Sequence, residues 1–184
     1  LTAEGLHSNV TNQFAGGAGN VGATSAGMTA AEIRKGMTYL NAAGVPKFSN
    51  KYVLAVHPYC LHDLMSETVA GGWLEVSKYT NNEEILNGEI GSIYGVKIVM
   101  TPNIQSAAEG AASAVVYRNF MLGREAYGQI DLAGEGAVKV IIKPLGAGDD
   151  PLNQRSTVGV KYWHVTKVLE AARAREIFAT ATLA

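Results

Sequence analysis

The amino-acid sequence predicts an α+β fold, with one clear helix and several short strands. The helix is expected over residues 29–43, where a capping pattern precedes a stripe of apolar residues. The strands are expected at short β-branched runs bounded by Gly or Pro, and residues 157–184 are especially rich in such runs. At 184 residues the chain is long enough for one well-buried core, with room for a division into two lobes.

The composition excludes several classes of protein. The net charge is −1 and charges of both signs are interspersed, which does not support a surface for nucleic acid or an anionic membrane. The single cysteine, Cys60, excludes an intrachain disulfide and suits a reducing compartment. No apolar run approaches the roughly 20 residues of a membrane-spanning helix. The chain starts at Leu1 without a signal peptide, and we expect it to begin inside a longer gene product.

The first 27 residues are expected to form a loop or arm. They are rich in Gly, Ala, Ser, Thr and Asn and lack periodicity, so they would need a partner surface to become ordered. Thr29 and Glu32 then form a capping box, and Gly44 marks the end of helix 29–43. The apolar stripe of this helix has helical spacing and consists of Ile33, Met37 and Leu40.

A buried strand is expected over residues 52–56, followed by a helix that begins at Pro58 and continues to about Met65. Residues 66–87 are polar and rich in turn formers, so we expect a long excursion on the surface. Long loops within compact domains are usually functional or make contacts. Large apolar residues in a polar loop commonly anchor contacts, and the two here are Trp73 and Leu74.

The glycine-rich stretch 87–102 is the part around which the other strands are expected to be arranged. Gly95 directly precedes a β-branched strand, 96–100, which predicts a positive φ or a close backbone approach at that glycine. No Gly-Lys-Ser/Thr follows, so the stretch is not a phosphate-binding loop. The later elements are expected to be a loop at 105–111, a strand at 114–117, a short helix at 122–127 and a strand at 138–142.

The C-terminal segment predicts two long strands, 157–169 and 176–182, joined as an antiparallel pair at a subunit boundary. We expect helix 29–43 to cover one face, and a neighbouring chain to cover the exposed edge, because two strands alone are not stable in water. Tyr162 is expected on the face opposite to Trp163. The residues expected at a subunit interface share the other face and are Lys161, Trp163 and Lys167.

The stretch from His57 to Asp63 is the strongest candidate for chemistry, because His57, Cys60, His62 and Asp63 are all metal-capable. Their spacing matches no standard zinc pattern, and a nucleophilic Cys60 would need a base and an electropositive setting. Glu83 or Glu84 with Glu89 could form an acid pair, but a solvated face is the simpler interpretation. We expect no catalysis, no metal and no cofactor.

Several of these segments occur in an order that is specific. They are helix 29–43, residues 52–58 with Asp63 and Leu64, residues 88–91 with Gly95 and Val96, and residues 150–161. In this order they resemble the major capsid proteins of tailed bacteriophages, in particular the N-four-like podophage family. The resemblance covers nearly everything after about residue 25.

The resemblance implies a Hong Kong 97-like phage capsid fold, with a peripheral domain of spine helix and long strands and a compact axial domain. On this map residues 1–27 are a remnant of an arm or loop. Residues 28–51 belong to the peripheral domain, with helix 29–43 as the spine helix. Residues 52–148 form the axial domain, and residues 149–184 return as strands of the peripheral domain.

The resemblance also implies a function: a structural protein that self-assembles into the icosahedral shell around double-stranded phage DNA. The implied partners are copies of itself in pentamers and hexamers, portal protein, scaffolding or decoration proteins, and packaged DNA bound non-specifically. The implied location is the virion capsid, after synthesis in the bacterial host cytoplasm. Two alternatives stay open: an encapsulin-type nanocompartment shell, which shares the fold, and an enzyme built on Cys60 and His57.

Overall fold

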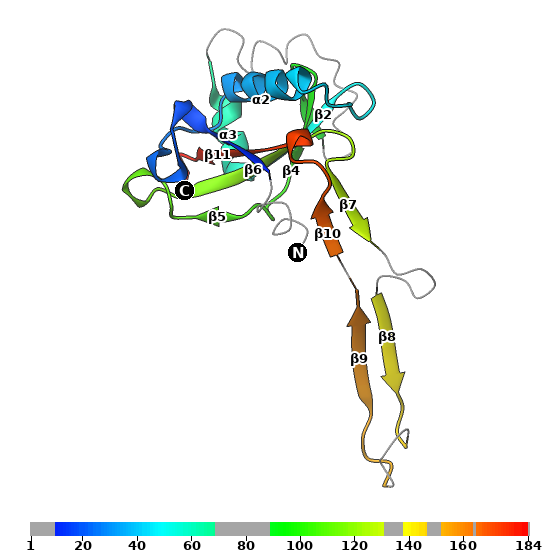
Figure 1. Cartoon of the computed structure of the whole chain (residues 1–184). Helices are drawn as coiled ribbons and strands as arrows, with labels where there is room; N and C mark the ends of the chain where they lie inside the picture. Colours follow the sequence, from blue (N-terminus) through cyan, green and yellow to red (C-terminus); the bar gives the residue numbers. More distant parts are fainter. Residues whose placement is uncertain (1–9, 69–88, 131–137, 147–151, 164, 184) are drawn as a thin grey trace. The chain divides into compact units, whose positions relative to one another are not determined.

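The computed structural model describes residues 10–68, 89–130, 138–146, 152–163 and 165–183 (Figure 1). The chain forms two compact units. We call the unit made of residues 1–127 and 168–184 the body, and the unit made of residues 128–167 the extension.

The body contains a mixed sheet of seven strands. Two neighbouring pairs in it are parallel, β1 with β11 and β2 with β4, and the other pairs are antiparallel. In sheet order the strands are β1 (Thr11–Phe14), β11 (Ala174–Thr180), β6 (Val116–Leu122), β2 (Tyr52–Val56), β4 (Val96–Met100) and β3 (Glu89–Ile93), while β5 (Ser106–Ala107) pairs with β6.

Two α-helices supply the apolar side chains that cover the sheet. α2 (Ala30–Ala42) starts at Thr29, whose hydroxyl accepts a hydrogen bond from the Glu32 amide. α3 (Pro58–Ser66) starts at His57, with proline in its first turn. The described residues of the body also form four short 3-10 helices: η1 (Ala15–Gly17), η2 (Val21–Ala23), η4 (Ala111–Ser113) and η5 (Ala171–Arg173).

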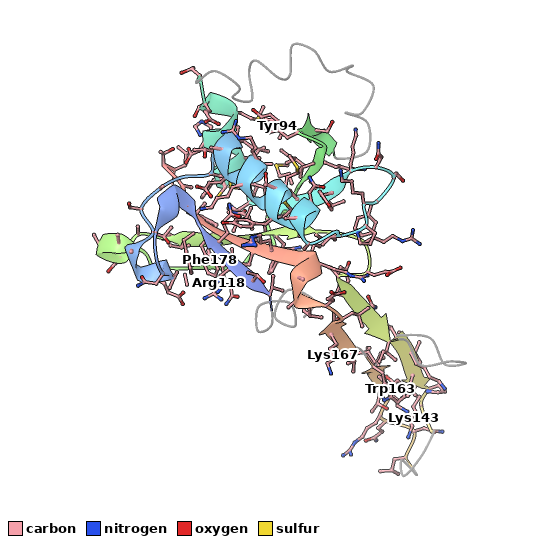
Figure 2. The ribbon with its side chains drawn as sticks, turned by 45° about the horizontal axis from the view of Figure 1, so that its top comes forward. Tyr94, Arg118, Lys143, Trp163, Lys167 and Phe178 are labelled. Atoms are coloured by element: carbon pink, nitrogen blue, oxygen red, sulfur yellow. The ribbon has the colours of Figure 1, made fainter. Side chains whose placement is uncertain are left out.

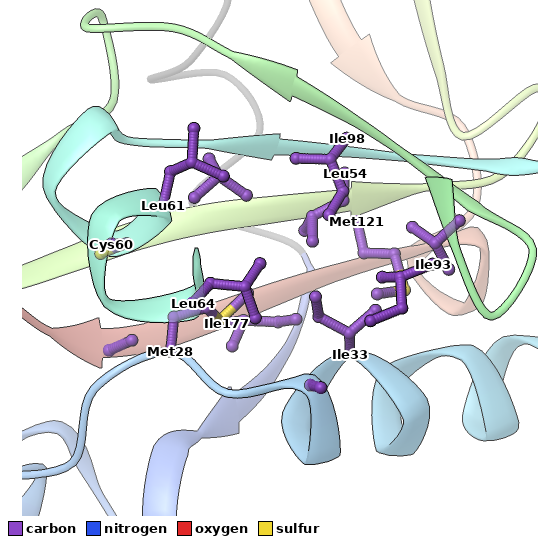
Figure 3. Close-up of a cluster of buried hydrophobic side chains, with 14 of the residues drawn as sticks. Met28, Ile33, Leu54, Cys60, Leu61, Leu64, Ile93, Ile98, Met121 and Ile177 are labelled. Atoms are coloured by element: carbon purple, nitrogen blue, oxygen red, sulfur yellow. The ribbon is translucent and has the colours of Figure 1, made fainter. Parts of the chain in front are cut away.

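The core lies between these helices and one face of the sheet (Figure 3). Leu54 of β2 is paired with Met121 of β6 and with Ile98 of β4, so the three side chains project from the same face. Ile33 of α2 and Leu64 of α3 join them, and all five side chains are fully buried. Removing apolar side chains such as these from water is the main favourable contribution to the stability of a folded domain.

The extension is built from two strand pairs. β7 (Tyr127–Ile130) pairs with β10 (Val165–Val168). β8 (Val138–Lys143) pairs with β9 (Thr157–Tyr162) in an antiparallel register of six residue pairs, from Val138 with Tyr162 to Lys143 with Thr157.

Several expected elements are confirmed in place. The strands at 52–56 and 96–100 have the predicted bounds, and the helix expected over 29–43 is α2 with Thr29 as its cap. Gly95 has a φ of 76°, as its position predicted, and Tyr94 beside it has a φ of 52°. Two positive φ values between Ile93 and Val96 make the tight turn that joins antiparallel β3 and β4.

Three predictions about local structure are wrong. Residues 10–27 do not need a partner chain to become ordered, because β1 is held by hydrogen bonds to β11. Residues 122–127 form no helix; they are the end of β6, a turn and the start of β7. The segments 157–169 and 176–182 do not pair with each other, because β11 lies inside the body sheet between β1 and β6.

The burial of β11 explains the last of these differences. All of its residues except Arg175 are buried, as expected for a strand with both edges paired and both faces covered. β9, by contrast, is exposed along its whole length. The β bias that the two segments share therefore corresponds to two different environments.

The compact units also do not follow the expected domain boundaries. The body sheet combines β1 from residues 1–27, β2 from residues 52–148 and β11 from residues 149–184. α2, expected as a spine helix of a separate domain, packs on this same sheet against β11.

Candidate assembly surface

One face of the β8–β9 ribbon is entirely apolar. Directly opposite residues in an antiparallel pair project to the same side, and every second pair shares that side. The pairs on this side are Val138–Tyr162, Val140–Val160 and Ile142–Val158. We call these six residues the apolar face. Each of them is 58% to 69% exposed, so no described residue of the chain covers the apolar face.

The opposite side of the ribbon is basic. Its pairs are Lys139–Lys161, Ile141–Gly159 and Lys143–Thr157. The two paired strands thus carry three lysines and no acidic residue. Next to β9, the Lys161 ammonium lies 3.8 Å from the centroid of the Trp163 ring, which is a cation–π contact. Figure 2 shows the side chains of Lys143, Trp163 and Lys167 on the extension.

A ribbon of this kind is not a stable unit in water. Two-stranded sheets are marginal unless a third strand or a packed face supports them. Within the described residues no third strand joins β8 or β9. Contiguous exposed apolar surface on a folded protein usually marks a contact site. The ribbon therefore has the chemistry of a surface that becomes buried on association.

The residues that the sequence predicted at an interface differ in how exposed they are in the structure. Lys161 and Lys167 are exposed. Trp163, which lies in the link that follows β9 in the chain, is partly buried. Trp73 and Leu74 lie outside the described residues. The structure adds the apolar face, which sequence reasoning missed: Tyr162, one of its members, was expected on the side opposite to the interface. The alternation in 138–143 and 157–162 was the available signal, but it required knowing that these two segments pair.

The candidate chemical stretch is part of the body core. Cys60 is fully buried, and its thiol receives a hydrogen bond from the Asn119 amide at 3.6 Å. Burial raises the pKa of Cys60 to about 12, against a smaller opposing effect of the Asn119 hydrogen bond. The thiol is therefore protonated at neutral pH, and a protonated, buried cysteine is a poor nucleophile and metal ligand.

The neighbours of Cys60 have structural contacts. The His57 Nδ1 accepts a hydrogen bond from the Tyr59 amide at 3.2 Å, and its ring stacks on Tyr117 at 4.3 Å between centroids. Burial lowers the pKa of His57. The Asp63 carboxylate accepts hydrogen bonds from the backbone and hydroxyl of Thr182, which fastens the segment after β11 to α3.

In the described part of the chain, no group of three or more His, Cys, Asp or Glu side chains could hold a metal ion. No helix of that part has the length and apolarity needed to cross a membrane. The side chains of Glu83, Glu84 and Glu89 lie outside that part.

One cavity, of about 170 Å³, is lined by side chains from β1, α2 and β11, including Lys35, Tyr39 and Arg175. The Arg175 guanidinium stacks on Tyr39 at 3.9 Å from the ring centroid. Burial lowers the pKa of Arg175, while Tyr39 opposes this shift. Neither His57 nor Cys60 lines the cavity, so it does not join the candidate nucleophile to a binding site.

The fold has clear counterparts among solved structures. The capsid of Ralstonia phage GP4 matches 95% of this chain with a TM-score of 0.68 and 16% identity. A chain of Mycobacterium phage Che8 matches 95% with a TM-score of 0.58 and 16% identity, and the capsid of cyanophage Pam1 matches 85% with 0.59 and 18%. The fold is that of phage capsid proteins. The resemblance seen in the sequence is thus confirmed at the level of the fold.

The matched chains are longer than this one. The chain spans about half of their length, at 53%, 55% and 49% respectively. No family model and no curated protein sequence matches the chain.

Proposed function

We propose that this protein is the major capsid protein of a tailed bacteriophage, and that its copies assemble into an icosahedral shell around double-stranded DNA. The observation that carries the proposal is the similarity of nearly the whole chain to the capsid of Ralstonia phage GP4. That similarity, at 16% identity, establishes a fold.

The chemistry of the extension supports this step. A shell subunit is completed by its neighbours, because closed shells need heterologous contacts that repeat around symmetry axes. The apolar face on β8 and β9 is a surface that a solitary protein would be expected to bury or to lack. A subunit of an assembly requires surfaces of this kind.

Within this proposal the fold is Hong Kong 97-like. The body, a compact sheet with flanking helices, corresponds best to the axial domain, and the extension to the long-stranded peripheral domain. Trp73 and Leu74 in the 66–87 excursion stay proposed as contacts between neighbouring axial domains. Lys161, Trp163 and Lys167 stay proposed as interface residues of the extension.

The proposed partners are copies of this chain in pentamers and hexamers, together with portal and scaffolding or decoration proteins. Packaged DNA would meet the inner surface without sequence specificity. The proposed site of action is the virion, after synthesis in the bacterial host cytoplasm.

Electron microscopy of the purified full-length gene product tests the proposal. Closed icosahedral particles are expected, and a product that stays monomeric under all assembly conditions would contradict it. Particle contents then separate two kinds of shell: a phage capsid holds DNA and a portal, whereas an encapsulin-type compartment holds a cargo enzyme. Of the two, the phage shell is favoured by the capsid neighbours.

A further inference from the structure

We propose that the cavity between β1, α2 and β11 binds a small oxyanion that carries a hydroxyl group, of which hydrogen phosphate is the simplest. All residues that line the cavity belong to the body, so the site is complete within a single chain and does not rest on the proposed function. The side chains that carry the inference are those of Gln13, Lys35, Tyr39 and Arg175.

The sheet and the helix bring these side chains to one place. Gln13 of β1 is aligned with Ile177 in the parallel pair, and Arg175 lies two residues before Ile177 in β11. Residues two apart in a strand project to the same face, so Gln13 and Arg175 lie on the face of the sheet that carries the core. Lys35 and Tyr39 are four residues apart in α2 and therefore share one side of that helix.

The lining of the cavity is positively charged. Lys35 and Arg175 belong to it, and none of its residues is acidic. None of the ion pairs among the described residues involves Arg175, whose Nε atom is buried there without a hydrogen-bond partner. Burying a charged group is costly unless it is paired. An oxyanion would supply the missing partner, since the guanidinium geometry matches carboxylates and phosphates.

Gln13 adds a requirement for a hydrogen-bond donor. Its side chain is 3% exposed, and its Nε2 donates to the Glu32 backbone oxygen at 2.9 Å and to the Glu32 carboxylate at 2.7 Å. These two bonds fix the orientation of the amide, because a flipped amide would direct its oxygen at two acceptors. The Oε1 atom is thus a buried acceptor without a partner among the described residues. A ligand with a hydroxyl group would satisfy it.

Size and charge limit the ligand further. The cavity, at about 170 Å³, is smaller than the roughly 300–1,000 Å³ of pockets for drug-sized ligands, so it suits an ion of a few atoms. The Glu32 carboxylate, which also accepts from the Gly16 amide, lies next to Gln13 but outside the lining. Two positive charges and this one negative charge favour an anion of low charge. The phosphodiesters of DNA have no hydroxyl on phosphorus and lack the donor that Gln13 requires.

Calorimetric titration of the unassembled full chain with inorganic phosphate at pH 7 tests the inference, with sulfate as the comparison ion. Both ions are tetrahedral and similar in size, but only phosphate keeps a hydroxyl group at this pH. We expect phosphate to bind and sulfate to bind about tenfold more weakly, because sulfate leaves the Gln13 Oε1 unpaired. Equal binding of the two ions would overturn the inference. So would the absence of phosphate binding at millimolar concentration, which is the result expected if another segment or a second copy already filled the cavity.

Two adjacent residues of α2 provide a matched pair of variants. Lys35→Gln and Arg34→Gln each remove one positive charge from an exposed position, but only Lys35 lines the cavity. We expect Lys35→Gln to weaken phosphate binding by about fivefold or more, and Arg34→Gln to change it by less than about twofold. Equal weakening by both variants would mean that phosphate responds only to the general surface charge, and would overturn the inference.

Nuclear magnetic resonance of the unassembled chain locates the bound ion. The signal of the Arg175 Nε–H group is identified as the one that disappears in Arg175→Lys, which keeps the charge but lacks this group. If that variant does not fold, the signal is identified by its proximity to the Tyr39 ring, on which the guanidinium stacks at 3.9 Å. Phosphate should shift this signal in the original chain and in Arg34→Gln. A signal that stays unchanged while phosphate binds would place the ion elsewhere and overturn the inference.

Discussion

The body and the extension use the same residue types in opposite ways. In the body, β-branched and aliphatic side chains such as Leu54, Ile98 and Ile177 are completely buried. In the extension, Val140 and Val160 are 58% and 62% exposed. The body is thus stabilised by contacts among its own residues, whereas no described residue covers the apolar face of the extension.

This difference has an energetic meaning. Burying a Val or Leu side chain contributes about 1.5–3 kcal/mol relative to leaving it exposed. The six side chains of the apolar face have not yet made most of that contribution, because each is still more than half exposed. An assembling protein can therefore keep a subunit soluble and ordered in its body while reserving apolar surface for its neighbours.

The largest expected difference in the free energy of unfolding is between two side-chain truncations, one in the body and one in the extension. Leu54→Ala should lower the free energy of unfolding by about 2–5 kcal/mol, because it leaves a cavity among Met121, Ile98 and their neighbours. Val160→Ala should change the stability of the unassembled chain by less than about 0.5 kcal/mol, since its side chain is already in water. Urea unfolding of the unassembled chains measures both.

The variants Leu54→Ala and Val160→Ala also differ in their expected effects on assembly. Val160→Ala should weaken assembly even though it leaves the unassembled chain unchanged, whereas Leu54→Ala should affect assembly only through folding. A large loss of stability in unassembled Val160→Ala would mean that the extension contributes to the fold of the single chain. The proposed division between the two units would then be wrong.

The next largest effect on stability concerns Asn119, a fully buried polar residue of the body. The Asn119 amide accepts a hydrogen bond from the His57 backbone at 3.0 Å and donates to Cys60. Asn119→Ala should lower the free energy of unfolding by about 1–3 kcal/mol, because it leaves the partly buried His57 amide without its acceptor. Thr157→Ala, an exposed polar residue of the extension, should stay within about 0.5 kcal/mol in the same unfolding assay. Similar losses in both would contradict this account.

A smaller effect separates two glycines that have equal space around them. A Cβ at Gly95 or at Gly159 would meet no atom within 4 Å, but only Gly95 has a positive φ, of 76°. Gly95→Val should therefore lower stability by about 1–2 kcal/mol through backbone strain alone. Gly159→Val in β9 should be neutral or slightly favourable, because valine suits a strand. Chemical denaturation of both variants decides the point, and Gly95→Asn should recover part of the loss.

The sequence was sufficient for elements with strong local signals. Thr29 with Glu32 located the start of α2, Pro58 located the start of α3, and the apolar run before His57 gave β2. The positive φ at Gly95 followed from a glycine placed directly before a strand. In each case a few neighbouring residues determine the structure, so no knowledge of distant pairing was needed.

Distant pairing is what the sequence did not reveal. Residues 157–162 and 174–180 have the same β bias, but one pairs with residues 138–143 and the other with residues 116–122. The mistaken pairing of the two segments led to Trp163 and the lysines as the expected interface. Only the register of β8 with β9 shows that Val140, Val160 and Tyr162 lie on one uncharged face.

At neutral pH the smallest expected effect on the free energy of unfolding is that of Cys60 ionisation. Its pKa is raised by burial from 9.0 to about 12, so the folded chain keeps this proton while the unfolded chain releases it above about pH 9. The unfolded state then binds fewer protons, so stability falls as pH rises through that window and does not depend on this thiol below it. The slope attributable to Cys60 should approach about 1.4 kcal/mol per pH unit, measured as the difference between the original chain and Cys60→Ala.

Thiol labelling makes the same point as a comparison between the units. At pH 8 an alkylating reagent should react slowly with Cys60 in the folded chain and rapidly once urea unfolds it, because the buried thiol is protonated. In a chain that combines Cys60→Ala with Val160→Cys, the single thiol lies on the exposed apolar face and should react rapidly before assembly. Assembly should then protect it. Fast labelling of native Cys60 would show that the body core is accessible to reagent, and equal labelling of Val160→Cys before and after assembly would show that assembly does not cover the apolar face.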